Sequence, residues 1–356
     1  MIGAAIAAAA LAMTAGGAGQ PEPRAVVWAV GDGADGSAPA RRLARMIERD
    51  EPDAVLYLGD VYPSGTAEDY ERNFEPVYGR LASITWPTAG NHEWGNREVG
   101  YYPYWRRYRR ARPWYRFELA GWELMALNSE APHSAGSKQL RWLDHALAER
   151  ETTCRLAFWH RPRFSAGTVH GDAPDVAPFW QSLRDRARLA LNGHEHVLMR
   201  YRKRAGLTEY VSGAGGSVRY SLRPNPRVAF GRSDRTGALR LTLTPGAARV
   251  DFRDLDGNLL DRSRATCERA LRSPAGPVAQ RLEQRTHNPS RAVPSGAARF
   301  LQPHARAVSE TPRRVAVTPP KRPVIGRWFA MRLHGAESRP PSEDYSAARL
   351  RTVPAR

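Results

Sequence analysis

The sequence predicts an α/β domain with a mixed system of β-sheets over residues 24–267. Short apolar runs rich in β-branched and aromatic residues alternate with amphipathic segments through most of this region, as expected when helices cover sheets. Strand-like segments separated by Gly and Pro follow, up to about residue 261, and they indicate hairpins. The chain has 356 residues, 42% of them hydrophobic, so it can bury a sizeable core.

Short apolar runs mark the predicted strands in the first part of the domain. The run AVVWAVG at 25–31 is typical, because β-branched and aromatic residues dominate it. The other predicted strands are 53–59, 83–90, a strand pair within 114–129, 154–160 and 188–194. The later hairpins begin near residue 197 and close with DLDG, in which Asp-Gly is a turn signal.

Apolar residues at helical spacing mark the predicted helices. Leu43, Met46 and Ile47 lie on one face of the first helix, and Pro52 ends it. The predicted helices are 38–52, 66–82, 134–151 and 176–187. Their positions between strands support an alternating α/β order.

The two ends of the chain differ from this domain. Residues 1–23 are apolar and Ala-rich, then small, and they predict a signal peptide or an Ala-rich arm. Residues 268–356 are rich in Pro, Arg, Ala and Ser, which predicts a disordered basic tail. One stretch of it, GPVAQRLEQRTHNPS, resembles a read-through of a transfer-RNA gene. The tail is therefore either a gene-calling artefact or a basic arm that binds nucleic acid or an anionic surface. Much of the net charge of +18 lies there, so that charge does not define a partner.

The chain has two cysteines, Cys154 and Cys267, at the edges of the predicted domain. In an exported protein such a pair predicts a disulfide. Two buried thiols are the alternative.

Five short motifs place polar residues at the ends of predicted strands. They are VGDG with Asp32, GDVY with Asp60 and Tyr62, GNHE with Asn91 and His92, FWHRP with His160, and NGHEH with His194 and His196. Sites in α/β sheets gather at the carboxyl ends of strands. Each residue alone is also typical of a turn, a helix cap or a structural hydrogen bond. Together they form a donor set suited to two divalent or trivalent metal ions.

The order of these motifs resembles that of the calcineurin-like metallophosphoesterases, and within them the bacterial relatives of purple acid phosphatases. The stretches ALNSE, QLRWL, WHRPRFSAG and SGAGG also resemble that branch. The resemblance covers about residues 25–267. It implies a four-layer αββα sandwich, with two mixed sheets face to face, helices on both outer sides and a dimetal site at the rim.

The resemblance also implies a role for each motif residue. Asp60 would bridge the two metals. The other ligands would be Asp32 and His196 for the first ion, and Asn91, His160 and His194 for the second. His92 would not bind metal. It would stabilise the phosphoryl group and protonate the leaving oxygen while a metal-bound hydroxide attacks in line.

Tyr62 departs from the family pattern. Purple acid phosphatases use a tyrosinate three residues after the bridging Asp, whereas Tyr62 lies two residues after Asp60. A shift of one residue on an extended segment turns a side chain the other way. Ala34 stands where many other metallophosphoesterases have His, which agrees with the purple acid phosphatase branch. Tyr62 is therefore either a ligand or an aromatic residue packed under the loop.

Two further residues are candidates for substrate binding. Arg161 follows His160, and His170 lies in FSAGTVHG; each could bind a substrate phosphate or lie on a loop surface. The stretch YYPYWRRYRRARPWYRF mixes aromatic residues with arginines, as in single-stranded nucleic-acid sites. We expect it instead to be a packed insertion at the rim of the site.

The predicted function is a metal-dependent phosphoric ester hydrolase, acid phosphatase-like, that acts on phosphate monoesters, with diesters as a second substrate class. Its cofactors would be two ions of Fe, Zn or Mn. A non-catalytic metal- or phosphate-binding protein on the same fold and a nucleic-acid-binding protein using the basic tail are the alternatives. We expect a small phosphate ester as the partner, no stable protein partner, no nucleic acid and no transmembrane anchor. The N-terminal segment predicts a secreted or cell-envelope protein.

Overall fold

A computed structural model describes residues 22–267 of the chain. The predicted signal peptide or arm lies almost wholly outside these residues, and so does the predicted basic tail. Within the described part, no helix combines the length and the apolar character needed to cross a membrane.

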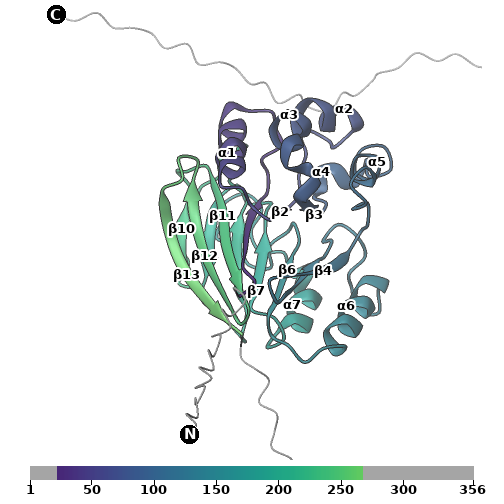
Figure 1. The fold of residues 1–356 in the computed structure, drawn as a ribbon, viewed down its shortest axis with the longest axis vertical. Coiled ribbons are helices and arrows are strands. Elements are labelled where there is room, and N and C mark those ends of the chain that lie inside the picture. Colours follow the sequence, from purple (N-terminus) through teal and green to yellow (C-terminus); the bar gives the residue numbers. More distant parts are fainter. Residues whose placement is uncertain (1–21, 268–356) are drawn as a thin grey trace, which may run out of the picture. The chain divides into compact units, whose positions relative to one another are not determined.

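Thirteen strands form two sheets in the described part of the chain (Figure 1). The first sheet contains β13 (Leu259–Thr266), β12 (Ala247–Asp254), β11 (Gly237–Thr244), β1 (Ala25–Val30), β2 (Ala54–Tyr57) and β3 (Thr85–Pro87), in this order. The second contains β10 (Val228–Arg232), β8 (Leu198–Tyr201), β9 (Thr208–Ser212), β7 (Leu189–Asn192), β6 (Arg155–Phe158), β5 (Trp122–Ala126) and β4 (Tyr115–Leu119).

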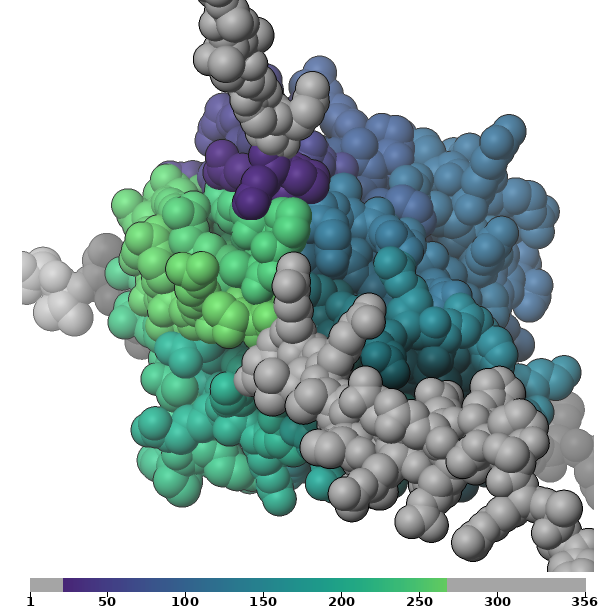
Figure 2. Space-filling view, turned by 60° about the horizontal axis from the view of Figure 1, so that its bottom comes forward, coloured from purple at the N-terminus to yellow at the C-terminus, as the bar shows by residue number. Residues whose placement is uncertain are grey.

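Both sheets are mixed, as predicted. Strand β1 is parallel to β2 but antiparallel to β11, and β9 is parallel to β7 but antiparallel to β8. Strand β11, which lies more than 200 residues after β1 in the sequence, pairs with it, and in the space-filling view green atoms from the end of the described chain lie beside purple atoms from its start (Figure 2). The final hairpins thus extend the first sheet, although the strands just before them belong to the second.

The helical segments lie in two groups along the chain. Those before β4 are α1 (Ala38–Arg49), α2 (Ala67–Asp69), the π-helical turn η1 (Tyr70–Phe74), α3 (Glu75–Tyr78), the 3-10 helix η2 (Gly79–Ile84), α4 (Asn91–Trp94) and α5 (Tyr101–Arg106). Those after β5 are α6 (Lys138–Ala148), the 3-10 helix η3 (Pro174–Val176) and α7 (Ala177–Leu183). The single helix predicted over 66–82 is thus a series of short turns, and α4 and α5 were not predicted.

The core confirms the four-layer αββα sandwich. One buried cluster joins residues of both sheets, such as Val27 and Leu56 from the first and Leu156 and Leu191 from the second. A second cluster joins the outer face of the first sheet to α1 and α3, and a third joins the second sheet to α6 and α7. Since burial of apolar area is the main favourable term in folding, these three interfaces hold the layers together.

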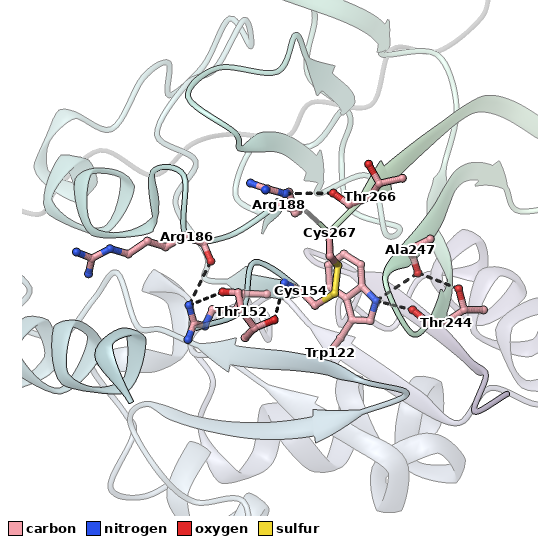
Figure 3. The surroundings of a disulfide bond; sticks show 10 residues. Trp122, Thr152, Cys154, Arg186, Arg188, Thr244, Ala247, Thr266 and Cys267 are labelled. Carbon is pink, nitrogen blue, oxygen red and sulfur yellow. Dashed lines mark hydrogen bonds between the residues drawn. A yellow bond between two sulfur atoms is a disulfide. The ribbon is translucent and has the colours of Figure 1, made fainter. Parts of the chain in front are cut away.

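A disulfide links the two sheets. Cys154 directly precedes β6 and Cys267 directly follows β13, and the two sulfurs are bonded across a sequence separation of 113 residues (Figure 3). The indole of Trp122 lies beside the bond and donates to the Thr244 carbonyl. The predicted disulfide is thus confirmed, and it lies at the end of β6 opposite to His160.

Candidate active site

The carboxyl ends of the central strands meet at one rim of the two sheets. Strands β1, β2 and β3 are parallel neighbours in the first sheet, and β5, β6 and β7 are parallel neighbours in the second. The polar residues that follow these strands are Asp32, Asp60 and Asn91 in the first sheet and His160 and His194 in the second. Because parallel strands end at the same edge, residues distant in sequence meet here.

Asp60 lies at the centre of the cluster and is 2% exposed. Its Oδ2 is 3.4 Å from Nε2 of His160, 3.5 Å from the hydroxyl of Tyr62 and 3.7 Å from Nε2 of His92. Its Oδ1 accepts a hydrogen bond of 3.1 Å from the backbone N–H of His92. One carboxylate oxygen therefore faces donor atoms on two sides.

Asp32, Tyr62 and His196 form a set of donors on one side of Asp60. Oδ1 of Asp32 is 3.2 Å from the Tyr62 hydroxyl and 3.4 Å from Nε2 of His196. The Tyr62 hydroxyl is 2.8 Å from the same nitrogen of His196. We call these three residues the first donor set.

Asn91, His160 and His194 form a second donor set on the other side. Nε2 of His160 is 3.1 Å from Oδ1 of Asn91 and 3.1 Å from Nδ1 of His194. One ligand atom from each of Asp60, His160 and His194 lies within 4.8 Å of the others. Asp60 is thus shared between the two donor sets.

The donor sets fit a pair of metal ions in their chemistry. Carboxylate, amide and phenol oxygens together with imidazole nitrogens suit Fe, Zn and Mn. Two rings are also oriented in the manner of metal-bound imidazoles, since Nδ1 of His160 lies 2.8 Å from the Leu58 carbonyl and Nδ1 of His196 lies 2.5 Å from the Val218 carbonyl. Such bonds leave Nε2 of each ring directed at the cluster. Metal binding by these residues stays a prediction.

Left-handed backbone conformations direct three of these side chains. Asp32, Asp60 and His194 have φ values of 57°, 69° and 70°. Non-glycine residues with such φ are uncommon and concentrate at functional sites. The backbone at Asp60 is therefore not extended, and the alternation that would turn Tyr62 away does not apply. The structure accordingly brings the Tyr62 hydroxyl to the cluster.

Two buried carboxylates bind the loops that carry the cluster. Glu93 accepts hydrogen bonds from the backbone N–H groups of Asp60, Val61 and Gly90. Glu195 accepts from the N–H groups of His170 and Gly171. Sequence reasoning gave neither residue a role, and only their place inside GNHE and NGHEH could have indicated one.

The charges of the cluster are strongly coupled. Burial raises the pKa of Asp60, but the positive charge of His160 outweighs it, so this pKa is lowered. For His160 burial lowers the pKa, but the carboxylate of Asp60 outweighs it and raises the pKa to about 10. For His194 burial and the charge of His160 both lower the pKa. The Asp60 carboxylate and the His160 imidazole thus each favour the charged form of the other.

The other predicted residues lie at the edge of the cluster. His92 has a side chain 35% exposed, and its Nδ1 is 2.5 Å from the Pro63 carbonyl. The exposed ring of His170 stacks on His194, with ring centroids 4.0 Å apart. Arg161 instead forms a bidentate pair with Glu130, at 2.8 and 3.0 Å. The structure thus brings His92 and His170 to the cluster, while one edge of the Arg161 guanidinium is engaged by Glu130.

The aromatic–arginine stretch is packed, as expected. Trp105 is fully buried and contacts Tyr70 and Phe74. The guanidinium of Arg110 covers the ring of Trp86 at 3.9 Å from its centroid. These rings hold neighbouring elements together, so they do not form an open stacking surface.

A family model agrees with this arrangement. Residues 25–198 match the model described as calcineurin-like phosphoesterase. The matched segment begins with β1 and ends at the first residue of β8, so it includes every residue of both donor sets and Asp60. No curated protein matches the chain.

Several solved structures share the fold at low sequence identity. A purple acid phosphatase from yellow lupin seeds has a TM-score of 0.57 at 18% identity, covering 69% of this chain and 54% of that chain. GAP50, the anchor in the inner membrane complex of Plasmodium, has a TM-score of 0.57 at 13% identity over 69% of this chain and 90% of that one. A dimetal phosphatase from Danio rerio has a TM-score of 0.50 at 14% identity, covering 69% of this chain and 99% of that chain. The chain spans about half of the lupin phosphatase, and these identities show the fold alone.

Proposed function

Because this chain belongs to the calcineurin-like phosphoesterase family, we propose that it is a dimetal-dependent hydrolase of phosphate monoesters. The observation that carries the proposal is the position of Asp60. Its carboxylate lies between two donor sets, one with Asp32, Tyr62 and His196 and one with Asn91, His160 and His194. A shared carboxylate is what a pair of neighbouring ions requires.

Each donor set would hold one ion, and Asp60 would serve both. When bound, the ions would polarise the phosphoryl oxygens, lower the pKa of a water molecule and orient it for in-line attack. Glu93 stabilises the position of Asp60, because its carboxylate accepts hydrogen bonds from the backbone N–H groups of both Asp60 and Gly90. The protein would thus supply donor groups that are held in place before a substrate binds.

His92 is suited to transfer a proton to the leaving oxygen. Its Nδ1 lies against the Pro63 carbonyl, so the Nδ1–H donates there and Nε2 faces Asp60 at 3.7 Å. A proton held on Nε2 can move to the ester oxygen as the bond to phosphorus breaks. His170, stacked on His194, is placed to contact a phosphoryl oxygen in the same step.

The two donor sets favour catalysis over binding alone. A protein that only used the fold as a scaffold, in the way that GAP50 is described as an anchor, would not need Asp60, His92 and both sets together. A nucleic-acid-binding protein would have no use for them either. The basic tail on which that alternative depends lies outside the described residues.

Metal analysis together with phosphatase assays tests the proposal. The purified chain should contain two metal ions and hydrolyse p-nitrophenyl phosphate faster than bis(p-nitrophenyl) phosphate. Asp60→Asn should reduce turnover by at least a hundredfold, whereas Glu71→Gln, which changes an exposed carboxylate, should leave it unchanged. Full turnover in Asp60→Asn, or in metal-free protein, would show that the proposal is wrong. A chain with bound metal but no turnover of any ester would favour the binding protein.

A further inference from the structure

Three arginines from separate segments line one cavity away from the donor sets. Arg163 lies in the loop after β6, Arg184 is the C-cap of α7, and Arg204 lies in the turn between β8 and β9. The cavity has a volume of about 300 Å³. Strand β8 begins two residues after His196 and runs away from it, so the turn with Arg204 lies at the far end of that strand. This cavity shares no residue with the cluster around Asp60.

Two aromatic rings form the wall behind these arginines. Phe164 and Trp180 line the cavity and meet edge to face, with ring centroids 5.1 Å apart. The guanidinium carbons of Arg163 and Arg204 lie 4.7 and 5.9 Å from the centroid of Phe164. Cation–π contacts thus hold these two charged groups beside the cavity.

The guanidinium groups that line this cavity are not paired with carboxylates within residues 22–267. None of the three arginines forms an ion pair there, and the residues that line the cavity include no Asp or Glu. The buried carboxyl of Glu209 accepts hydrogen bonds from the backbone N–H groups of Arg163 and Phe164, and the charge of Arg163 only partly offsets the rise in its pKa that burial causes. Like charges that converge without a counter-charge repel one another, and an anion relieves that repulsion.

We propose that this cavity binds a small phosphorylated anion, such as a diphosphate or a nucleoside monophosphate. Guanidinium groups present forked donors that match phosphoryl oxygens. Trp180 and Gln181 also line the cavity, and their indole N–H and amide groups are neutral donors of a kind that can bind phosphoryl oxygens. The volume of about 300 Å³ is at the lower end of the range for small-molecule sites, which suits a ligand larger than one inorganic phosphate.

Titration calorimetry in the Asp60→Asn background separates this cavity from the catalytic centre. Pyrophosphate and AMP, each titrated at 150 mM NaCl, are the probes. We expect saturable binding that weakens at least tenfold in Arg184→Gln/Arg204→Gln and less than twofold in Arg24→Gln/Arg45→Gln, which removes two exposed arginines elsewhere. Arg184→Lys/Arg204→Lys keeps the positive charges but removes the paired N–H donors of the guanidinium groups. Its affinity for the probes should therefore lie between those of the Asp60→Asn protein and the Arg184→Gln/Arg204→Gln variant.

The outcome does not depend on whether the chain is a phosphatase, because no turnover is measured. Tighter binding of AMP than of pyrophosphate would identify a nucleotide as the ligand. Tighter binding of pyrophosphate would identify a diphosphate. Hydrogen exchange should slow on binding in the segments around Arg163 and Arg204. Equal affinities in the two Gln double variants, or no saturable binding in Asp60→Asn, would overturn the proposal.

Discussion

Removing the disulfide should destabilise the fold without disabling the proposed catalytic centre. The perturbation is Cys154→Ala together with Cys267→Ala, which opens a loop with a sequence separation of 113 residues. Closing a loop of about 100 residues lowers the entropy of the unfolded chain by an amount worth about 4.7 kcal/mol. The free energy of unfolding should therefore fall by roughly 3 to 5 kcal/mol, which is a large part of the ~5–15 kcal/mol of a typical domain.

Activity should respond differently from stability. Cys154 precedes β6 whereas His160 follows it, so the bond and the donor sets lie at opposite ends of this strand. Guanidinium unfolding followed by tryptophan fluorescence measures the stability, and p-nitrophenyl phosphate turnover at 20 °C measures the site. Reduced wild-type protein should unfold at the same denaturant concentration as the variant, which controls for the loss of the cysteine side chains.

A change in unfolding free energy below about 1 kcal/mol would refute this reasoning. It would mean that the unfolded chain is already restricted, so that the covalent link removes little entropy. A loss of turnover larger than fivefold under folding conditions would refute the prediction that activity is retained. It would show that the disulfide between the sheets also sets the geometry of the donor sets.

Two further predictions concern titration and the phenol. Burial raises the pKa of Glu209 to about 8 from 4.5, so between about pH 4.5 and 8 the unfolded chain loses a proton that the folded chain keeps. Stability should fall across this window by up to about 1.4 kcal/mol per pH unit; urea unfolding of Glu209→Gln should show a flatter profile, and an unchanged profile would contradict the assignment. Iron-loaded wild type should show a visible charge-transfer band that Tyr62→Phe lacks and Tyr102→Phe keeps. Absence of the band in wild type would remove Tyr62 from the ligands.

The local residue pattern was sufficient to predict the strands and the polar residues at their ends. The runs before Asp32, Asp60, His160 and His194 are apolar and short, and each forms a buried strand. The order of the motifs then implied a shared rim, because parallel strands end at one edge. The two-sheet topology could not be read in the same way. Strand β11 pairs with β1 across more than 200 residues. The residues of the β11–β12 hairpin do not by themselves specify β1 as the partner of β11.

The position of Tyr62 shows why the cluster could be predicted only in part. Its orientation depends on a left-handed conformation at Asp60, a non-glycine residue for which sequence favours an extended or helical φ. That conformation is held by Glu93, whose carboxylate binds the N–H groups of Asp60 and Val61 from 33 and 32 residues away. A Cβ on Gly90 would lie 2.1 Å from Oδ1 of Asp60, so the glycine of GNHE permits the same approach. The geometry of the phenol is therefore a product of contacts between two motifs, and spacing within GDVY alone cannot decide it.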